Sequence, residues 1–265
     1  MIKRSTSIPP AAAKKRARRP KVRLAALGLA ALLALGAYCA GLQPATASVV
    51  AKRRELPIYS VARDDSVIAI SFDASWGADK TLRLLDILDE YGVKTTFFLV
   101  DIWVQAYPDV VKEIAARGHE IGNHSTTHPH MSQLSEAQII KELATQSDHI
   151  EALTGARPTL FRPPYGDYND RLIRTAAAEG YQTIQWSVDS LDWKNRGVQD
   201  IIARAKKAQS GDIVLFHNDA EYTVDALPEI LDYYKAQGYK IVPVSEILLA
   251  GNTAIDIQGR QYAVQ

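Results

Sequence analysis

The chain has 265 residues, of which 47% are hydrophobic and 23% charged, and this composition is typical of a globular protein of one or two domains. It excludes a collagen-like, disulfide-scaffold or wholly disordered chain. The formal net charge is +1, but the first 24 residues hold nine of the 31 Lys and Arg and no acidic residue, so the remainder has 22 basic against 30 acidic side chains. An acidic body argues against nucleic acid as a partner.

Residues 24–42 form an uncharged, apolar run that as a helix, rising about 1.5 Å per residue, covers nearly all of a roughly 30 Å hydrocarbon core. The basic segment 1–23 precedes it, which by the positive-inside tendency keeps the amino terminus in the cytoplasm. We therefore predict a single-pass anchor in the cell membrane and an extracytoplasmic body. Ala45-Thr46-Ala47 resembles a signal peptidase site, so the alternative is a secreted protein cleaved near Ala47.

After a predicted linker at 43–63, short β-rich runs alternate with amphipathic segments, the pattern of parallel strands joined by crossover helices. We predict seven strands, at 67–72, 95–100, 119–122, 159–161, 183–188, 212–216 and 240–243. Helices are predicted at 80–91, 108–117, 135–153, 168–179, 198–208 and 223–236. This rhythm indicates one domain over 64–250, followed by a poorly ordered tail at 251–265. The only cysteine, Cys39, lies in the apolar run, so the body has no thiolate site.

Most of the unusual polar residues follow a predicted strand directly. They are Asp73, Asp101, His124, His128, Arg162, Asp189, Asp192 and His217. In a parallel barrel or a doubly wound sheet the carboxyl ends of the strands meet at one face, where ligands bind. Any one of these residues could be a loop cap or a solvated charge, but together they predict a single site.

Two of these segments indicate particular chemistry. His124 and His128 are four residues apart, a spacing that lets both imidazoles reach one metal ion. Two prolines follow Arg162 and hold Tyr165 in a rigid turn, although a stiff loop without chemistry has the same pattern. Trp193 could pack under a sugar ring or plug the core. Three further histidines are interpreted as structural or solvated: His119, His130 and His149.

Five segments, 71–73, 124–129, 162–166, 189–193 and 215–217, occur in the order of the five motifs of the polysaccharide deacetylase family, also known as the NodB homology domain or carbohydrate esterase family 4. The resemblance covers about 64–250. The segment Phe72-Asp73-Ala74-Ser75-Trp76-Gly77 resembles the branch with the sporulation-associated PdaB-like and YlxY-like proteins. The resemblance implies an α/β fold, a distorted (β/α) barrel of about seven parallel strands, here preceded by the predicted N-terminal helix.

The resemblance also implies that the chain removes acetyl groups from N-acetylated sugars with one divalent metal ion, Zn²⁺ being the expected one. It implies that His124 and His128 are the metal ligands and that Asp73 is the general base, oriented by Arg162. It also implies that His217 is the general acid, with the Asp192 carboxylate beside it. The backbone N–H of Tyr165 would stabilise the oxyanion, and Trp193 would contact substrate.

One position departs from the family pattern. Active relatives have a second aspartate after the base, which completes an Asp-His-His metal site, whereas this chain has Ala74. Loss of that anionic ligand predicts weaker metal binding. Asp101 could replace the missing ligand, or it could be an ordinary turn carboxylate.

Three functions are compatible with these residues. The first is a membrane-tethered N-deacetylase of an N-acetylated cell-wall glycan, with peptidoglycan the expected substrate. The second, suggested by Ala74, is a non-catalytic glycan-binding or sporulation-associated pseudoenzyme. The third, an amidohydrolase of small substrates, is less favoured because an anchored, outward-facing body meets polymer first. Nothing in the sequence indicates a protein partner.

Overall fold

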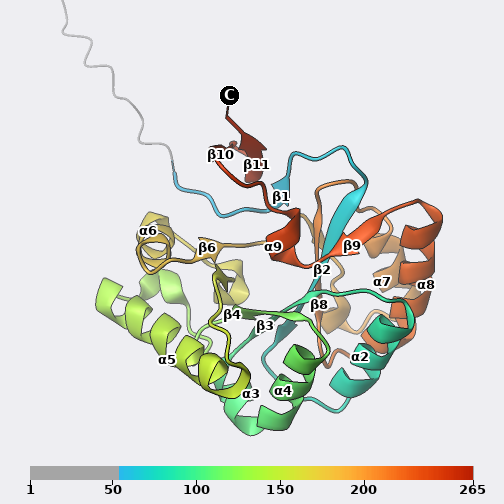
Figure 1. Ribbon diagram of the computed structural model, residues 1–265, viewed down its shortest axis with the longest axis horizontal. Coiled ribbons are helices and arrows are strands. Elements are labelled where there is room, and N and C mark those ends of the chain that lie inside the picture. The colour runs from blue at the N-terminus through green and yellow to red at the C-terminus, as the bar shows by residue number, and fades with distance from the viewer. Residues whose placement is uncertain (1–53, 265) are drawn as a thin grey trace, which may run out of the picture. The chain divides into compact units, whose positions relative to one another are not determined.

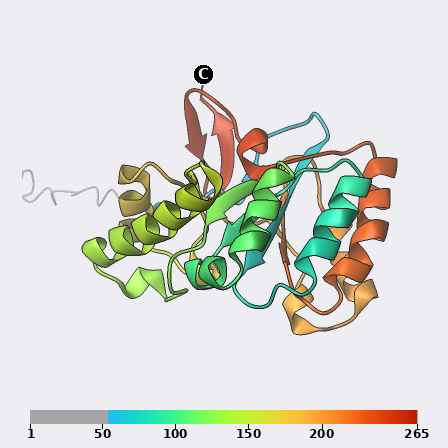
Figure 2. The same ribbon diagram turned by 60° about the horizontal axis from the view of Figure 1, so that its bottom comes forward.

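The computed structural model describes residues 54–264, in which helices surround a parallel sheet and a small hairpin lies apart from them (Figures 1 and 2). The strands are β1 (Ser60–Val61), β2 (Val67–Ala74), β3 (Thr96–Leu99), β4 (Glu120–Asn123), β5 (Leu160–Phe161), β6 (Gln182–Thr183), β7 (Val188–Asp189), β8 (Ile213–His217), β9 (Lys240–Val242), β10 (Thr253–Ile255) and β11 (Arg260–Ala263). The α-helices are α2 (Thr81–Glu90), α3 (Asp101–Ala106), α4 (Pro108–Ala116), α5 (Glu136–Thr154), α6 (Asp170–Ala178), α7 (Val198–Ala205), α8 (Thr223–Ala236) and α9 (Val244–Ile247).

Strand β2 passes through the middle of the sheet, and all eight of its residues are buried. Because successive side chains of a strand point to opposite faces, its residues form two rows. The row from Ile68 to Ala74 packs in the cluster beneath the helices. The other row begins with the apolar Val67 and Ala69 and ends with Ser71 and Asp73. Asp73 therefore lies at the carboxyl end of the strand, on the face turned away from the helices.

The predicted α/β fold with parallel strands is confirmed, and the strand order explains its barrel-like curvature. The order is β6-β5-β4-β3-β2-β8-β7, every pairing is parallel, and β9 pairs with the first half of β2. The strands at the two ends of this order, β6 and β7, lie in one continuous segment, 182–189. That segment was predicted as a single strand, but it pairs with β5 at its start and with β8 at its end. It therefore bends and connects the two ends of this open, half-barrel sheet.

The six predicted helices are α2, α4, α5, α6, α7 and α8, with ends shifted by up to three residues. Local signals fix these ends. Ser135 and Gln138 form a capping box at the start of α5, and Gly155 ends that helix with a φ of 75°. The short helices α3 and α9 were not predicted, because six and four residues are too few to show a helical period.

The predicted tail at 251–265 was wrong for most of its length. Strands β10 and β11 form an antiparallel hairpin, and β11 pairs with β1 inside the predicted linker 43–63. Gly211 allows β1 to lie close to the segment before β8, because a Cβ at position 211 would lie 1.9 Å from the carbonyl oxygen of Val61. The sequence of this region has no long apolar run, so its order depends on pairing between the two ends of the described segment. The folded unit thus includes residues before 64 and after 250.

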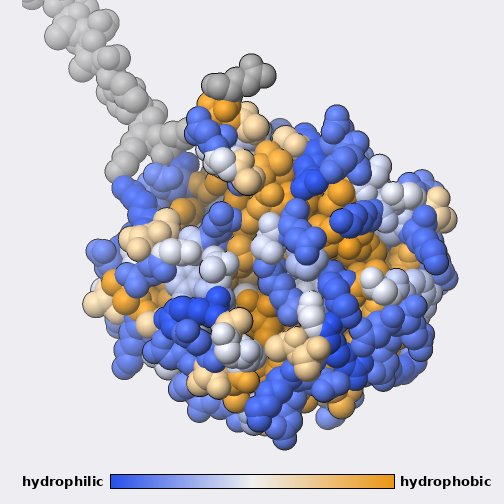
Figure 3. All heavy atoms as spheres, in the orientation of Figure 1, coloured by the Kyte–Doolittle hydropathy of each residue, from blue (hydrophilic) through white to orange (hydrophobic). Residues whose placement is uncertain are grey.

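The helices that surround the sheet are mostly hydrophilic on their outer faces, whereas hydrophobic residues show through below the hairpin (Figure 3). Leu248, Leu249 and Ile255 pack on the second hydrophobic cluster, which includes Val67 of β2 and Ile213 of β8. Within residues 54–264, no helix has the length and apolar character needed to span a membrane. The predicted span at 24–42 lies outside the described residues, as do the basic segment 1–23 and the cleavage site near Ala47.

Candidate active site

Four of the predicted residues lie together at the carboxyl ends of the strands. Asp73 at the end of β2 is the register partner of His217 at the end of β8. Asn123 of β4 and Phe161 of β5 are also register partners. His124 and Arg162 are the residues that directly follow them. The Asp73 Oδ2 atom lies 3.5 Å from Nε2 of His124. The parallel sheet thus brings together side chains that are up to 144 residues apart in the sequence.

Asp73 and Arg162 form a buried ion pair. Nη1 of Arg162 donates to Oδ1 of Asp73 at 2.7 Å, and Nη2 donates to Oγ of Ser71 and to the carbonyl oxygen of Gln185. The guanidinium has no solvent exposure and lies over the ring of Phe98. Burial raises the pKa of Asp73, but the charge and hydrogen bond of Arg162, with the charge of His217, outweigh burial and hold that pKa below 3.8. Asp73 is therefore an ionised carboxylate near neutral pH.

His217 pairs with a second buried carboxylate. Its Nδ1 lies 2.7 Å from Oδ1 of Asp192, and its backbone N–H donates to Oδ2 of Asp192 at 2.7 Å. Thr223 donates to the same Oδ2 atom. Burial lowers the pKa of His217, but the hydrogen bond and charge of Asp192, with smaller contributions from Asp73 and Asp189, outweigh burial and raise it above 6.5. The imidazolium form of His217 is therefore favoured.

His124 and His128 have the opposite electrostatic character. Burial lowers the pKa of both, and that of His128 falls to about 4, so both rings are neutral near pH 7. Nδ1 of His124 lies 2.7 Å from the carbonyl oxygen of Arg162, which can only accept, so this nitrogen carries the proton. The lone pair is then on Nε2, facing the Asp73 carboxylate. Neutral imidazoles held in this way are suited to bind a metal cation.

The donor set nevertheless fits a divalent metal ion only in part. Among residues 54–264, no three His, Cys, Asp or Glu side chains are placed so that they could hold one ion. The methyl group of Ala74 lies in the cluster beneath the helices and supplies no ligand. Asp101 does not replace the missing carboxylate, because its two oxygens accept from Gln105 and pair with His149. His149, interpreted from the sequence as a solvated residue, is thus a partner of a buried carboxylate.

The loop that carries both histidines is held by a residue that the sequence did not indicate. Oε2 of Glu142, on α5, accepts from the backbone N–H groups of Thr126 and Thr127 at 2.9 and 2.8 Å. Its Oε1 accepts from the hydroxyl of Thr127 at 2.8 Å. A carboxylate that accepts three hydrogen bonds from one loop fixes the course of that loop. The only sequence signal was a glutamate on a predicted amphipathic helix, which normally indicates a solvated residue.

Replacing Glu142 with alanine should therefore loosen the loop without altering either histidine. We expect a loss of about 1–2 kcal/mol in the free energy of unfolding and faster amide hydrogen exchange at residues 125–128. The control is Lys141→Ala, which removes an exposed neighbour on the same helix that makes no hydrogen bond to a described residue. Unchanged exchange in Glu142→Ala would show that other contacts determine the loop.

Three exposed aromatic side chains lie in or beside the predicted motifs: Trp76, Tyr165 and Trp193. The ring of Tyr165 stands edge-on to His128, with 4.5 Å between centroids, and its backbone has a φ of 59°. The Tyr165 N–H donates no hydrogen bond to another described residue, so it is available to an oxyanion. Trp193 is half exposed, and Nζ of Lys194 lies 4.8 Å from its ring centroid. Trp76 was not predicted as a site residue, yet its ring lies 5.1 Å from that of His217.

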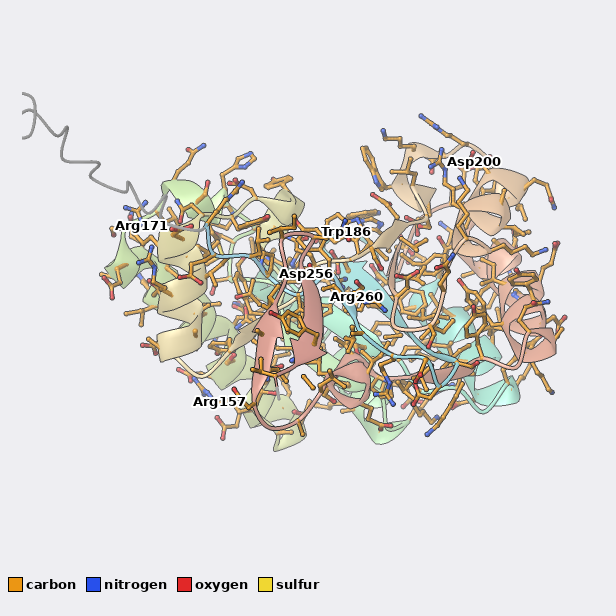
Figure 4. The ribbon with its side chains drawn as sticks, turned by 90° about the horizontal axis from the view of Figure 1, so that it is seen from above. Arg157, Arg171, Trp186, Asp200, Asp256 and Arg260 are labelled. Atoms are coloured by element: carbon orange, nitrogen blue, oxygen red, sulfur yellow. The ribbon has the colours of Figure 1, made fainter. Side chains whose placement is uncertain are left out.

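A hollow of about 410 Å³ lies near the start of β8. Trp186 and Arg260 contribute to its lining and are seen from above in Figure 4. It also includes Asp212, which precedes β8, whereas His217 ends that strand. This hollow is therefore at the amino end of β8, and the candidate active site is at the other end.

Comparison with known proteins agrees with this geometry. The family model described as "Polysaccharide deacetylase" matches residues 60–184. A peptidoglycan-N-acetylglucosamine deacetylase of Bacillus cereus is 41% identical over 196 residues, which cover 72% of this chain and 92% of the relative. The chain belongs to the polysaccharide deacetylase family. The family match contains Asp73, both neutral histidines and Arg162, and it ends before Asp192 and His217.

Family members of two kinds are similar to this chain. The uncharacterized protein YlxY of Bacillus subtilis is 34% identical, over 72% of this chain and 60% of the relative. Among solved structures, a CE4 family pseudoenzyme of Bacillus anthracis is 34% identical with a TM-score of 0.70, over 72% of this chain and 68% of that one. A mutant of that pseudoenzyme is described as having restored enzymatic activity. The chain therefore resembles both deacetylases and a pseudoenzyme of this family.

Proposed function

We propose that this protein is an N-deacetylase of an extracytoplasmic N-acetylated glycan, with peptidoglycan as the substrate. The observation that carries the proposal is that Asp73 and His217 are register partners on neighbouring strands and that their pKa values are shifted in opposite directions. Arg162 and its neighbours lower the pKa of Asp73, and Asp192 raises that of His217. Environments that push two pKa values apart create an acid and a base side by side, which hydrolysis of an amide requires.

In the proposed reaction, ionised Asp73 accepts a proton from the water that attacks the acetyl carbonyl carbon. Arg162 holds the Asp73 carboxylate in place through the 2.7 Å hydrogen bond. The N–H of Tyr165 donates to the resulting oxyanion. His217 then gives its proton to the amide nitrogen, the C–N bond breaks, and acetate and a free amine leave. A divalent cation held by His124 and His128 would polarise the acetyl carbonyl.

The glycan and its location are supported by separate observations. The relative from Bacillus cereus is named a peptidoglycan-N-acetylglucosamine deacetylase, and the apolar run 24–42 after a basic segment favours a membrane anchor with the body outside. A body tethered in this way would meet cell-wall polymer. A sporulation role has only the resemblance to the PdaB-like and YlxY-like branch to support it.

The second candidate function is a non-catalytic wall-glycan binder. Two observations favour it: Ala74 leaves the described part of the chain without a three-ligand cluster, and the chain is similar to a CE4 family pseudoenzyme. In such a protein the groove and its aromatic side chains would remain while turnover was lost.

The direct test measures acetate release by the full chain from purified peptidoglycan and from chitin oligomers. The assay is run with added Zn²⁺ and with a chelator, and the metal content of the protein is measured in parallel. We expect Zn²⁺-stimulated release from peptidoglycan. Absence of acetate from every amino-sugar polymer in the presence of metal would exclude the first function and favour the second.

Substitution of Ala74 by aspartate distinguishes the two functions. The Ala74 methyl group packs in the apolar cluster beneath the helices, so the added carboxylate should raise Zn²⁺ affinity by roughly 10- to 100-fold, measured by calorimetry, only where the longer side chain turns toward His124 and His128. Ala74→Asn is the matched control, since it adds the same bulk without charge. A pseudoenzyme should gain metal occupancy and acetate release in Ala74→Asp only, whereas an enzyme adapted to Ala74 should gain little or lose turnover.

A further inference from the structure

Trp76 is a large hydrophobic side chain that the packing of the protein does not explain. It lies between β2 and α2, three residues after Asp73, and is 44% exposed. It belongs to none of the hydrophobic clusters of the described residues. Its indole N–H donates no hydrogen bond to a described residue. The indole is therefore open to contact a ligand beside the site.

The backbone next to Trp76 is fixed by contacts from two other segments. The carbonyl oxygen of Gly77 accepts from Nε1 of Trp103 at 2.6 Å and from Nδ2 of Asn218 at 3.0 Å. Gly77 has a φ of 52°, and a Cβ at this position would lie 1.9 Å from Oδ2 of Asp219. Asn218 and Asp219 directly follow His217 in the chain. The segment that presents Trp76 is therefore held against the segment that presents His217.

The indole of Trp76 packs beside the imidazole of His217, with 5.1 Å between ring centroids and 31° between planes. On the other flank of the site, Tyr165 stands edge-on to His128, with 4.5 Å between ring centroids and 66° between planes. His217 and His128 thus each have an exposed aromatic neighbour, Trp76 and Tyr165 respectively. The two aromatic side chains are not equivalent with respect to a substrate.

The chemistry of the bond to be broken decides which aromatic residue faces the sugar. The sugar ring is attached through the amide nitrogen, and in the proposed function this nitrogen receives its proton from His217. The ring must then extend from the His217 side, where Trp76 is exposed. The acetyl carbonyl lies toward the N–H of Tyr165. Trp193 is also exposed, but its ring makes no contact with His217 among the described residues.

We propose that Trp76 is a substrate-binding residue whose indole stacks against the N-acetylhexosamine ring being deacetylated. This inference rests on the proposed function for the orientation of the sugar. It does not require turnover, because a glycan can stack on the indole whether or not the amide is hydrolysed. The ligand class is a β-linked N-acetylhexosamine polymer, which offers the indole an apolar ring face.

The test measures binding of the N-acetylglucosamine tetramer and of purified peptidoglycan to the full chain and its variants. Trp76→Ala should weaken tetramer binding by about tenfold, which corresponds to about 1.4 kcal/mol, because it removes the apolar face on which the sugar ring stacks. Trp76→Phe should stay within about threefold of wild type. The matched control is Tyr262→Ala, which removes an exposed aromatic side chain of the β10–β11 hairpin. Circular dichroism establishes that each variant is folded.

The outcomes separate this inference from the proposed activity. If wild type releases no acetate but Trp76→Ala alone weakens binding, the activity fails and the sugar contact stands. If wild type releases acetate and Trp76→Ala has the same KM for the tetramer, the contact fails and the activity stands. Wild type that binds neither glycan, or equal losses in Trp76→Ala and Tyr262→Ala, would overturn the inference.

Discussion

Replacing Arg162 with methionine should lower the free energy of unfolding by about 3–5 kcal/mol, the usual cost of leaving one member of a buried ion pair alone. Both charged groups are buried, and Nη1 of Arg162 is 2.7 Å from Oδ1 of Asp73. Without the guanidinium, the Asp73 carboxylate loses the charge that offsets its burial, so its pKa should rise. Urea unfolding at neutral pH measures the loss of stability, and acetate release should fall with it.

Two controls make this prediction specific. Arg83→Met breaks the ion pair with Asp225, whose members are 69% and 51% exposed, and should cost less than about 1 kcal/mol. The double variant Asp73→Leu with Arg162→Met should be more stable than Arg162→Met alone, because it leaves no charge buried without a partner. If the free energy of unfolding of Arg162→Met were within about 1 kcal/mol of that of wild type, water or another cation would already compensate the Asp73 charge.

The same pair contributes a defined dependence of stability on pH. The folded pKa of Asp73 lies below its ordinary value of 3.8, so the folded state binds the proton less tightly than the unfolded state. The stabilisation is therefore present above pH 3.8 and is lost as the pH falls through the lower folded value. Arg162→Met should remove this contribution, so its stability should change less steeply than that of wild type in that acid range.

The sequence predicted which strand-end residues lie together better than it predicted the contacts around them. Asp73, His124, Arg162 and His217 each end or follow a parallel strand, and parallel topology alone brings strand ends to one face. Asp192 was also expected beside His217, and the structure places it within 2.7 Å. Short-range pattern was sufficient for these residues because a strand end is a local feature.

Contacts between distant segments could not be predicted in the same way. Glu142 and His149 look like solvated residues of an amphipathic helix, and only the packing of α5 shows that they hold the histidine loop and Asp101. The hairpin after residue 251 depends on pairing with β1, nearly 200 residues earlier. Trp76 was visible in the motif, but nothing local indicates that its ring lies beside His217. In each case the missing information is which segments pack together.

Substitution of Asp192 by asparagine should have the largest effect on His217. Asp192 is fully buried and accepts from His217 Nδ1, from the His217 backbone and from Thr223. Asparagine has the same shape but no charge, so burial, which lowers the pKa of His217, would no longer be outweighed. NMR titration of His217 should show its pKa falling from above 6.5 to below that value. Because protonated His217 supplies the proton for the amine, we expect acetate release at pH 7 to fall by about 10²-fold or more.

The pH dependence of stability gives an independent readout of the same substitution. Because the folded pKa of His217 is raised, its ion pair with Asp192 stabilises the fold fully below pH 6.5 and loses this effect as the pH rises through the folded pKa. The stability difference between wild type and Asp192→Asn should therefore be larger at pH 6 than at pH 9. Asp189→Asn is the matched control, since the Asp189 side chain accepts from the Leu191 N–H rather than from His217. A difference that is constant with pH, or an equal fall in the His217 pKa in both variants, would contradict the assignment of Asp192 as the residue that holds His217 in its protonated form.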